Sequence, residues 1–121
     1  MSRFATAVNC MDGRVQLPVI EWIKGYCGAD YVDMITVPGP DKALAEKGDV
    51  RSIYDRVAVS VQKHGSGHIF IAGHYDCAGN PVDEKEHQEQ LKRAVEAVRR
   101  WGFDAEVKGL WINEEWKVRT I

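Results

Sequence analysis

The sequence lacks the features that mark several large classes of protein. Its apolar runs all fall short of the roughly 18 residues that a membrane-spanning helix needs, and the opening "MSRFATAVNC" has no apolar stretch of the signal-peptide kind. Charges of both signs are interspersed and sum to −2, which gives neither a basic stripe for nucleic acid nor an acidic tail. The sequence therefore predicts a cytoplasmic protein that binds neither nucleic acid nor a membrane.

Cysteine is also scarce. Three thiols are an odd number in a chain of 121 residues with no export signal, so a disulfide framework is not expected. A chain of this length can bury a core without disulfides, and we expect one domain over residues 1–121. The three cysteines are then either buried apolar side chains or ligands.

What the sequence does contain is a regular alternation of short apolar runs and helical patterns. Strands are expected at 4–9, 31–39 and 68–73 and in the C-terminal runs "AEVKGLWI" and "WKVRTI". Helices are expected in "LPVIEWIKGYCG", from near Asp49 to the "HGSG" break, and from about Asp83 to Trp101. The segment "PDKALAEKG" is expected to be a loop or a loose helical turn. This order predicts an α/β fold of three layers, with a mostly parallel β-sheet, helices on both faces and an antiparallel C-terminal strand.

Two of the buried strands end on residues that bind soft metals. Cys10 follows the first strand, and His74 follows the third, with Cys77 three residues later. Chemistry in an open parallel sheet gathers at the carboxyl ends of the strands, so these side chains meet if the two strands are neighbours. Two thiolates and one imidazole suit zinc, and three protein ligands leave a fourth position open, as in catalytic sites.

The residues after Cys10 add a candidate for acid–base chemistry. Asp12 is placed to accept a hydrogen bond from a water molecule on the metal, and Arg14 can hold the Asp12 carboxylate through a two-pronged ion pair. Two thiolates make zinc a weaker Lewis acid than three neutral imidazoles do, so this help matters. Each residue alone also has an ordinary explanation: a buried thiol, a satisfied histidine, a loop ion pair.

The remaining cysteine and histidines receive structural interpretations. Cys27 lies on the apolar face of a predicted helix and is assigned to the core. His64, His68 and His87 are expected to face solvent or to cap neighbouring elements.

At "CMDGR" (10–14) and "HYDC" (74–77) the chain resembles the β-class carbonic anhydrases, whose signature is C-x-D-x-R followed by H-x-x-C after a buried strand. The resemblance implies one Zn²⁺ held by Cys10, His74 and Cys77, a catalytic dyad of Asp12 and Arg14, and hydration of carbon dioxide to bicarbonate. It also implies assembly as a homodimer or a higher homo-oligomer. In some members of the family the aspartate binds the zinc and closes the site, so Asp12 is an alternative fourth ligand.

The sequence departs from the family pattern beside the motifs. "VPGPD" (37–41) stands where the family typically shows Arg-Asn-Ala-Gly, and Ala78 precedes Gly79 where a glycine usually follows the second cysteine. These changes leave the metal ligands intact and alter the substrate pocket. Related folds use the same ligands to hydrolyse carbonyl sulfide or carbon disulfide, which makes a small linear molecule the expected substrate class.

These residues suggest three candidate functions. The first is hydration of carbon dioxide by zinc-bound water that Asp12 orients and Arg14 supports. The second is a zinc-binding protein without turnover, with Asp12 as a permanent fourth ligand. The third, a cysteine nucleophile of the phosphatase kind, needs a longer phosphate-binding loop than the three residues between Cys10 and Arg14.

The C-terminal run "GLWINEEWKVRTI" bears on assembly. It places Trp111 and Trp116 in a terminal hairpin, where the aromatic rings either cover a partner subunit or cover the edge of the chain's own sheet.

Overall fold

The computed structural model describes residues 2–48 and 50–121. In chain order its elements are β1 (Phe4–Cys10), the short 3-10 helix η1 (Gly13–Val15), α1 (Gln16–Cys27), β2 (Tyr31–Val37), α2 (Pro40–Ala45), α3 (Arg51–His64), β3 (His68–His74), α4 (Glu84–Arg99), β4 (Glu106–Ile112) and β5 (Val118–Thr120). Asp49, the predicted start of the second long helix, lies outside the described residues, and α3 begins at Arg51.

One sheet of five strands runs through the centre of the molecule in the order β2-β1-β3-β4-β5. The first four strands are parallel, and β5 pairs antiparallel with β4. β1 lies directly beside β3, with Val8 opposite Ile71. The condition for the two ligand-bearing strand ends to meet is therefore fulfilled.

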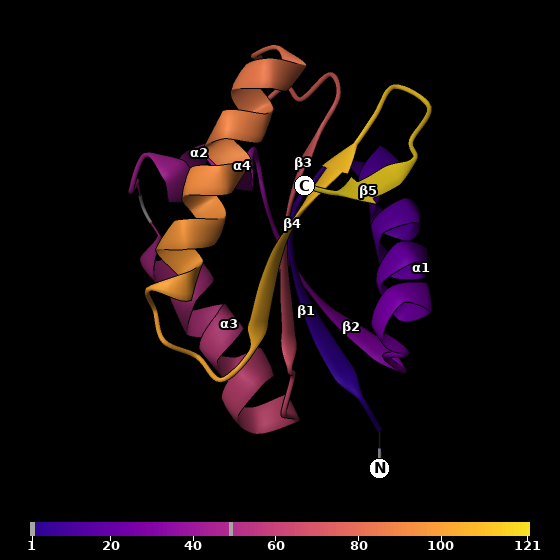
Figure 1. Ribbon diagram of the computed structural model, residues 1–121, viewed down its shortest axis with the longest axis vertical. Coiled ribbons are helices and arrows are strands. Elements are labelled where there is room, and N and C mark those ends of the chain that lie inside the picture. Colours follow the sequence, from indigo (N-terminus) through magenta and orange to yellow (C-terminus); the bar gives the residue numbers. More distant parts are fainter. Residues whose placement is uncertain (1, 49) are drawn as a thin grey trace.

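Helices cover both faces of this sheet, as the alternating pattern predicted (Figure 1). α1 lies alone on one face, and α2, α3 and α4 lie on the other. Successive strand residues point to opposite faces, so Ala7 packs in the apolar cluster beneath α1 and Val8 packs in the cluster beneath α3 and α4. β1, β3 and most of β4 are buried on both sides, which explains why they read as continuous apolar runs, whereas the edge strand β2 buries only Ile35.

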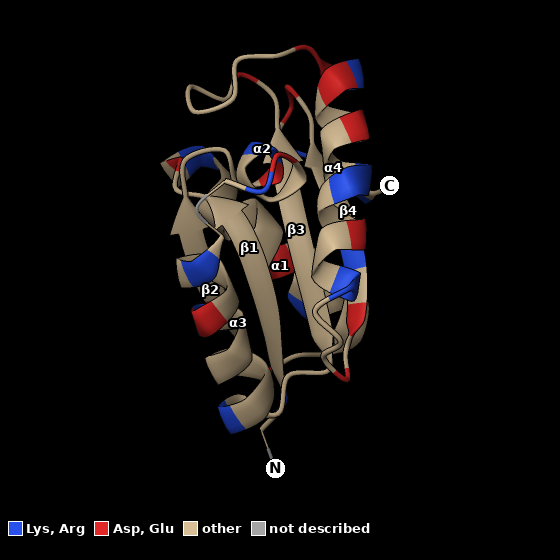
Figure 2. Ribbon diagram, turned by 90° about the vertical axis from the view of Figure 1, so that its left-hand side faces the viewer, with Lys and Arg blue, Asp and Glu red and all other residues tan. Residues whose placement is uncertain are grey.

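The charged residues lie mainly on the helices and loops around this core. Figure 2 shows basic and acidic residues following one another along α4, whose opposite face carries Leu91, Ala94 and Val98 into the core. None of the described helices combines the length and the apolar character that crossing a bilayer requires.

The segment expected to be a loop or a loose helical turn contains a short helix. Residues 40–45 form α2, because Pro40 occupies a first-turn position that needs no amide hydrogen and Leu44 is anchored in the core at 1% exposure. The structure therefore has the helical alternative of the two.

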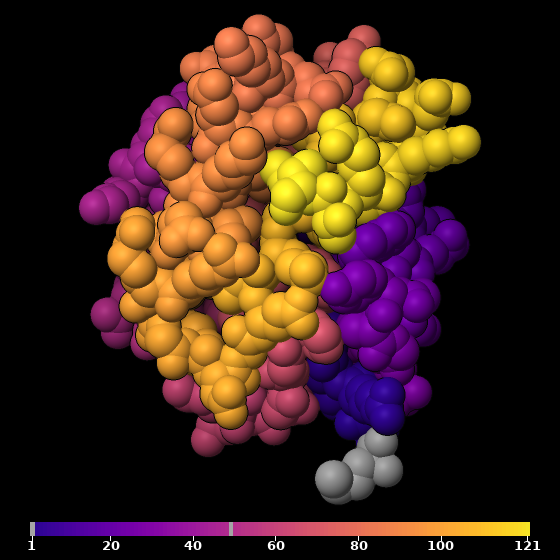
Figure 3. Space-filling view, in the orientation of Figure 1, coloured from indigo at the N-terminus to yellow at the C-terminus, as the bar shows by residue number. Residues whose placement is uncertain are grey.

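The C-terminal hairpin folds back over α1, as the adjoining yellow and purple surfaces show (Figure 3). Trp111 is buried within the chain at 2% exposure, and Trp116 is partly buried against the cluster beneath α1. Trp111 therefore covers the chain's own sheet, and Trp116 packs within the chain while part of its ring is exposed.

Candidate metal centre

The structure brings the three predicted ligands together at the carboxyl edge of the sheet. Cys10 is the last residue of β1, and His74 is the last residue of β3. The ligand atoms of Cys10, His74 and Cys77 all lie within 4.8 Å of one another, and the two sulfur atoms are 3.9 Å apart. Each of the three residues is at most 4% exposed. Such a set of converging thiol and imidazole groups has the size and the donor chemistry of a tetrahedral zinc site.

Cys77 reaches this edge through a tight turn. Asp76 adopts a left-handed backbone conformation with φ of 57°, which aspartate tolerates better than most residues. The turn brings the chain back over the end of β3. The loop that follows Cys10, at the end of β1, is held by Gln16. Its side-chain amide donates to the carbonyl oxygens of Cys10 and Asp12 at 2.7 and 2.9 Å.

The histidine is oriented as a metal ligand would be. His74 Nδ1 lies 2.7 Å from the carbonyl oxygen of Tyr75, and a carbonyl only accepts, so Nδ1 carries the hydrogen. Nε2 is then left with a free lone pair, and it is buried with no hydrogen-bond partner. A buried polar atom without a partner is costly, and a cation between the two sulfurs would satisfy this one. The residues present therefore fit the metal that the ligand set implies.

The two thiols share one proton between them. Donation from the Cys77 thiol lowers the pKa of Cys10 to about 3 and raises the pKa of Cys77 well above its usual range. Burial lowers the pKa of His74, but its interaction with Cys10 and its hydrogen bond to the Tyr75 carbonyl outweigh burial and raise it overall. The lowered pKa of Cys10 favours the thiolate, which is the form that binds a metal.

Asp12 and Arg14 form the predicted ion pair. Arg14 Nη2 lies 2.7 Å from Asp12 Oδ2, and Arg14 Nε contacts both carboxylate oxygens at 3.1 and 3.2 Å. The Arg14 hydrogen bond lowers the pKa of Asp12 to about 2, and the same contact raises the pKa of Arg14. The carboxylate faces the guanidinium and is not among the described groups whose ligand atoms converge within 4.8 Å.

Two residues to which the sequence patterns gave no part in the dyad hold Arg14. Arg14 Nη1 contacts Asp76 Oδ2 at 3.2 Å, Nη2 donates to the Asp76 carbonyl at 3.1 Å, and the guanidinium lies 4.6 Å from the centre of the Trp116 ring. Asp76 occupies a variable position of the H-x-x-C motif and Trp116 lies in the C-terminal hairpin, so only the folded chain shows that both adjoin the dyad.

The prediction for His87 was wrong. This residue is 1% exposed, and its Nδ1 lies 2.6 Å from Oδ2 of Asp41, which is equally buried. The sequence did carry a signal, because His87 lies four residues before Leu91 on the buried face of α4. His64 and His68 are partly exposed, as expected, and His64 Nδ1 pairs with Asp33 at 2.7 Å.

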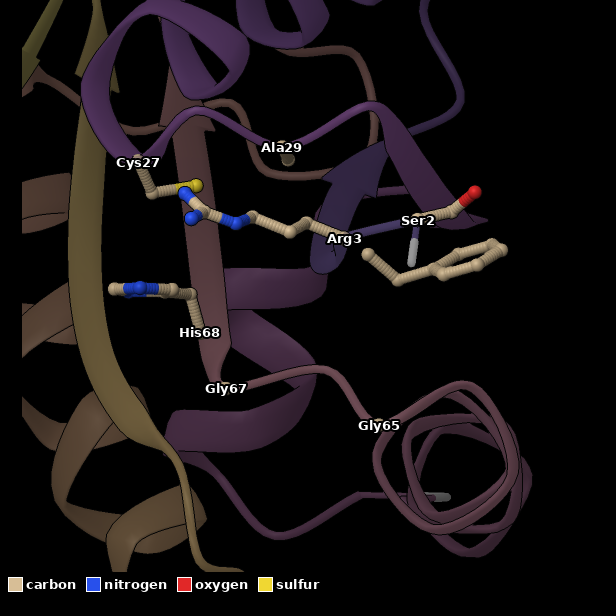
Figure 4. A pocket seen from close by; sticks show the side chains of 8 residues that line it. Ser2, Arg3, Cys27, Ala29, Gly65, Gly67 and His68 are labelled. Atoms are coloured by element: carbon tan, nitrogen blue, oxygen red, sulfur yellow. The ribbon is translucent and has the colours of Figure 1, made fainter.

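Cys27 lies far from the three ligands, at the amino end of the sheet. It is partly buried rather than enclosed, packs against the cluster beneath α1 and lines a cavity together with Arg3 and His68 (Figure 4). In this view the Arg3 guanidinium extends toward the Cys27 sulfur. A second cavity, of about 430 Å³, adjoins the candidate metal centre and is lined by Tyr75, Cys77 and Trp111 among others.

Comparisons with known proteins agree with this geometry. A family model described as "Putative carbonic anhydrase" matches residues 1–121. No match is found among curated proteins.

Three solved structures share the fold. A carbonic anhydrase from Streptococcus mutans is 19% identical with a TM-score of 0.58, covering 96% of this chain and 80% of that one. A tetrameric β-carbonic anhydrase from Sordaria macrospora is 14% identical with a TM-score of 0.59, covering 100% and 82%. A β-carbonic anhydrase from Aspergillus fumigatus is 16% identical with a TM-score of 0.52, covering 99% and 76%. With the family model matched over all 121 residues, this chain belongs to the carbonic anhydrase family that the model describes.

Proposed function

We propose that the protein is a zinc-dependent enzyme that hydrates carbon dioxide to bicarbonate. The observation that carries the proposal is the buried, unpartnered Nε2 of His74 beside two sulfur atoms 3.9 Å apart, with the Asp12–Arg14 pair two and four residues beyond Cys10. Membership of the carbonic anhydrase family supports the same activity.

Cys10, His74 and Cys77 would hold the metal. Their donor set, two sulfurs and one imidazole nitrogen, matches zinc and leaves one position for a small molecule. When bound, zinc supplies a Lewis acid that lowers the pKa of a water molecule and so makes a nucleophile available near neutral pH. The hydrogen bond from His74 Nδ1 to the Tyr75 carbonyl fixes the ring so that Nε2 faces the sulfurs.

Asp12 would orient the attacking water. Its carboxylate only accepts hydrogen bonds, and the low pKa that Arg14 imposes keeps it ionised. Arg14 already donates twice to each carboxylate oxygen, at 2.9 and 3.1 Å to Oδ1 and at 2.7 and 3.2 Å to Oδ2, so a water would be a further partner, reached through the 20% of the Asp12 side chain that is exposed. Arg14 in turn is held by Asp76 and Trp116, so the carboxylate cannot rotate freely. Asp12 thus acts by position rather than by coordinating the metal.

The surroundings suit a small, uncharged substrate. The cavity of about 430 Å³ beside Cys77 is more than ten times the space of about 30 Å³ that one water occupies. Its lining combines Trp111, Pro81 and Val82 with the acidic residues Asp76, Asp83, Glu84 and Glu114, and such a lining disfavours an anionic substrate more than a neutral one.

We further propose that the protein works as a homo-oligomer in the cytoplasm. Three large apolar side chains at the carboxyl end of the sheet are well exposed: Met11 at 61%, Leu17 at 67% and Tyr75 at 48%. A partner subunit would cover such side chains beside the site. The structural neighbour from Sordaria macrospora is described as tetrameric, which supports assembly.

The test combines metal analysis with a hydration assay. Purified wild-type protein is expected to contain one zinc per chain and to release protons rapidly on addition of carbon dioxide. Asp12→Ala is expected to keep the zinc and lose about 10²-fold or more of the rate, because the group that orients the water is gone.

Two outcomes would contradict the proposal. One zinc per chain without any hydration from neutral to alkaline pH would leave a metal-binding protein without this activity. Full activity in Asp12→Ala would remove the role of the dyad. Carbonyl sulfide and carbon disulfide are assayed in parallel, because turnover of either in place of carbon dioxide would assign the site to a related hydrolysis.

A further inference from the structure

A buried polar cluster lies behind the candidate metal centre, and the mechanism above does not use it. Asp41, Asn80, His87 and Gln90 are each at most 3% exposed. Asn80 Nδ2 donates to Gln90 Oε1 at 2.6 Å and to Asp41 Oδ1 at 3.1 Å, while His87 Nδ1 lies 2.6 Å from Asp41 Oδ2. Four polar side chains this deep in a small protein need a reason, because apolar residues of similar size would fill the space at less cost.

The cluster ties together two loops that meet backbone to backbone. Gly39, with φ of 52°, precedes α2, and Gly79 follows Cys77. A Cβ atom on Gly39 would lie 2.9 Å from the Gly79 carbonyl oxygen, and one on Gly79 would lie 2.8 Å from Pro38 Cβ. Only glycine at both positions permits this approach. Asp41 lies two residues after Gly39, and Asn80 lies directly after Gly79. The hydrogen bond between these two side chains joins the two segments.

Each ligand-bearing segment is in contact with this arrangement. The segment that carries Cys10 is paired with the segment that leads into Gly39: Cys10 lies opposite Val37 in the sheet, and the Met11 amide donates to the Val37 carbonyl at 3.1 Å. The Asn80 amide also donates to the Cys77 carbonyl at 3.2 Å.

The third ligand is reached through β3. Gly73, directly before His74, lies under the Asp41 carboxylate, where a Cβ atom would come within 2.7 Å of Oδ2. The cluster therefore adjoins the chain segments that carry Cys10, His74 and Cys77.

We propose that Asp41, Asn80, His87 and Gln90 form a positioning network for the metal centre, which locks residues 38–41, at the start of α2, against the 77–80 loop and so fixes the separation of Cys10 and Cys77. The proposal rests on the metal binding proposed above. It assigns a role to the two segments where the sequence departs from the β-class pattern, "VPGPD" and the Ala78–Gly79 pair. The two segments contact each other, and "VPGPD" contributes Asp41 to the network.

The network acts through geometry. Two sulfurs and one nitrogen bind zinc well only when their separations match a tetrahedron, and the hydrogen bond between Asn80 and Asp41 holds together the segments that adjoin the two sulfurs. If the link between the loops is removed, the sulfurs are free to move apart while the ligands themselves remain. Groups that orient metal ligands from behind typically change metal affinity by about 10–100-fold when they are mutated.

The test uses Asn80→Ala, which breaks the link between the loops and changes no ligand. The matched control is Ser66→Ala. Ser66 is also a buried polar residue, at 2% exposure, and it lies at the opposite end of the sheet. Its hydroxyl accepts a hydrogen bond from the Thr6 hydroxyl at 2.8 Å. Both substitutions remove a buried hydrogen bond and are expected to lower the melting temperature. Zinc affinity is measured by competition with a chromophoric chelator, below the melting temperature of every variant.

We expect Asn80→Ala to weaken zinc binding at least about tenfold, and Ser66→Ala to leave it within about twofold of wild type. Hydrogen exchange of the metal-free proteins supplies a second measurement, in which Asn80→Ala should speed exchange of the amides at 39–41 and 77–80 and Ser66→Ala should not. If Asn80→Ala does not fold, Gln90→Met replaces it. This variant keeps the side-chain volume, removes one hydrogen bond to Asn80 and should shift zinc affinity in the same direction by a smaller factor.

The outcomes separate the two proposals. Wild-type protein that binds no zinc would overturn the proposed function, and the positioning role would fall with it. Wild-type protein that binds zinc together with folded network variants that bind it equally well would overturn the network alone. Equal loss of affinity in Asn80→Ala and Ser66→Ala would show that general stability, rather than the link between the loops, sets the affinity.

Discussion

The two ends of the sheet carry similar residues and differ in what the residues do. At the carboxyl end, Cys10, Cys77 and His74 converge within 4.8 Å and are buried. At the amino end, Cys27 and His68 line an open cavity with Arg3 (Figure 4) and are not among the described residues that converge on a common point. A cysteine and a histidine therefore do not make a metal site by themselves. Burial, convergence and a partner that orients the imidazole distinguish one end from the other.

Replacing residues of matched type at the two ends tests this contrast most severely. We expect His74→Ala to lower the affinity for zinc by more than about 100-fold. This exceeds the effect of removing a group that only orients a ligand, because here a ligand itself is removed. His68→Ala, at the amino end, is expected to bind zinc as wild type does. Stoichiometry by metal analysis after gel filtration distinguishes them, and zinc retained in His74→Ala would contradict the assignment of this end.

Removal of the metal gives the next largest effect. Zinc that binds only the folded state stabilises it by about 2.7 kcal/mol when free zinc is about 100 times its dissociation constant. Chemical denaturation of the wild type with zinc and with a chelator should show this difference. Cys27→Ser should retain the zinc-dependent gain and Cys10→Ser should not. A gain of equal size in both variants would place the metal elsewhere.

Substitution of one glycine at each end of the sheet tests how tightly the backbone is packed there. A Cβ atom on Gly79 would lie 2.8 Å from Pro38 Cβ, whereas one on Gly67 would have nothing within 4 Å. We expect Gly79→Ala to reduce the free energy of unfolding by about 1–3 kcal/mol, as overpacking does, and Gly67→Ala to change it by less than about 0.5 kcal/mol. Urea denaturation of the metal-free proteins measures both. Similar values for the two variants would show that the 38–41 and 77–80 loops separate easily.

The sequence was sufficient for most of the fold. Apolar runs with turn residues between them located all five strands, and the short helical patterns placed α1 and α4 close to their observed limits. The pairing of Cys10 with His74 followed from one further rule, that parallel strands present their carboxyl ends at the same edge.

What the sequence did not predict has a common physical cause. The Asp41–His87 pair depends on a contact between segments 46 residues apart, where local patterns carry little information. A polar residue is predicted to be exposed until its partner is known, and the partner of His87 lies in a segment that was expected to be a loop or a loose helical turn. The contacts of Asp76 and Trp116 with Arg14 were not predicted for the same reason, because each joins Arg14 from a distant part of the chain.

Arg14 has a consequence for how relatives of this protein are compared. Its guanidinium contacts the loop after β1, the turn after β3 and the ring of Trp116 from the C-terminal hairpin. Trp116 therefore adjoins the proposed catalytic dyad, even though no signature sequence includes it. Relatives that keep both short motifs but differ in this hairpin should be expected to differ in catalytic behaviour as well.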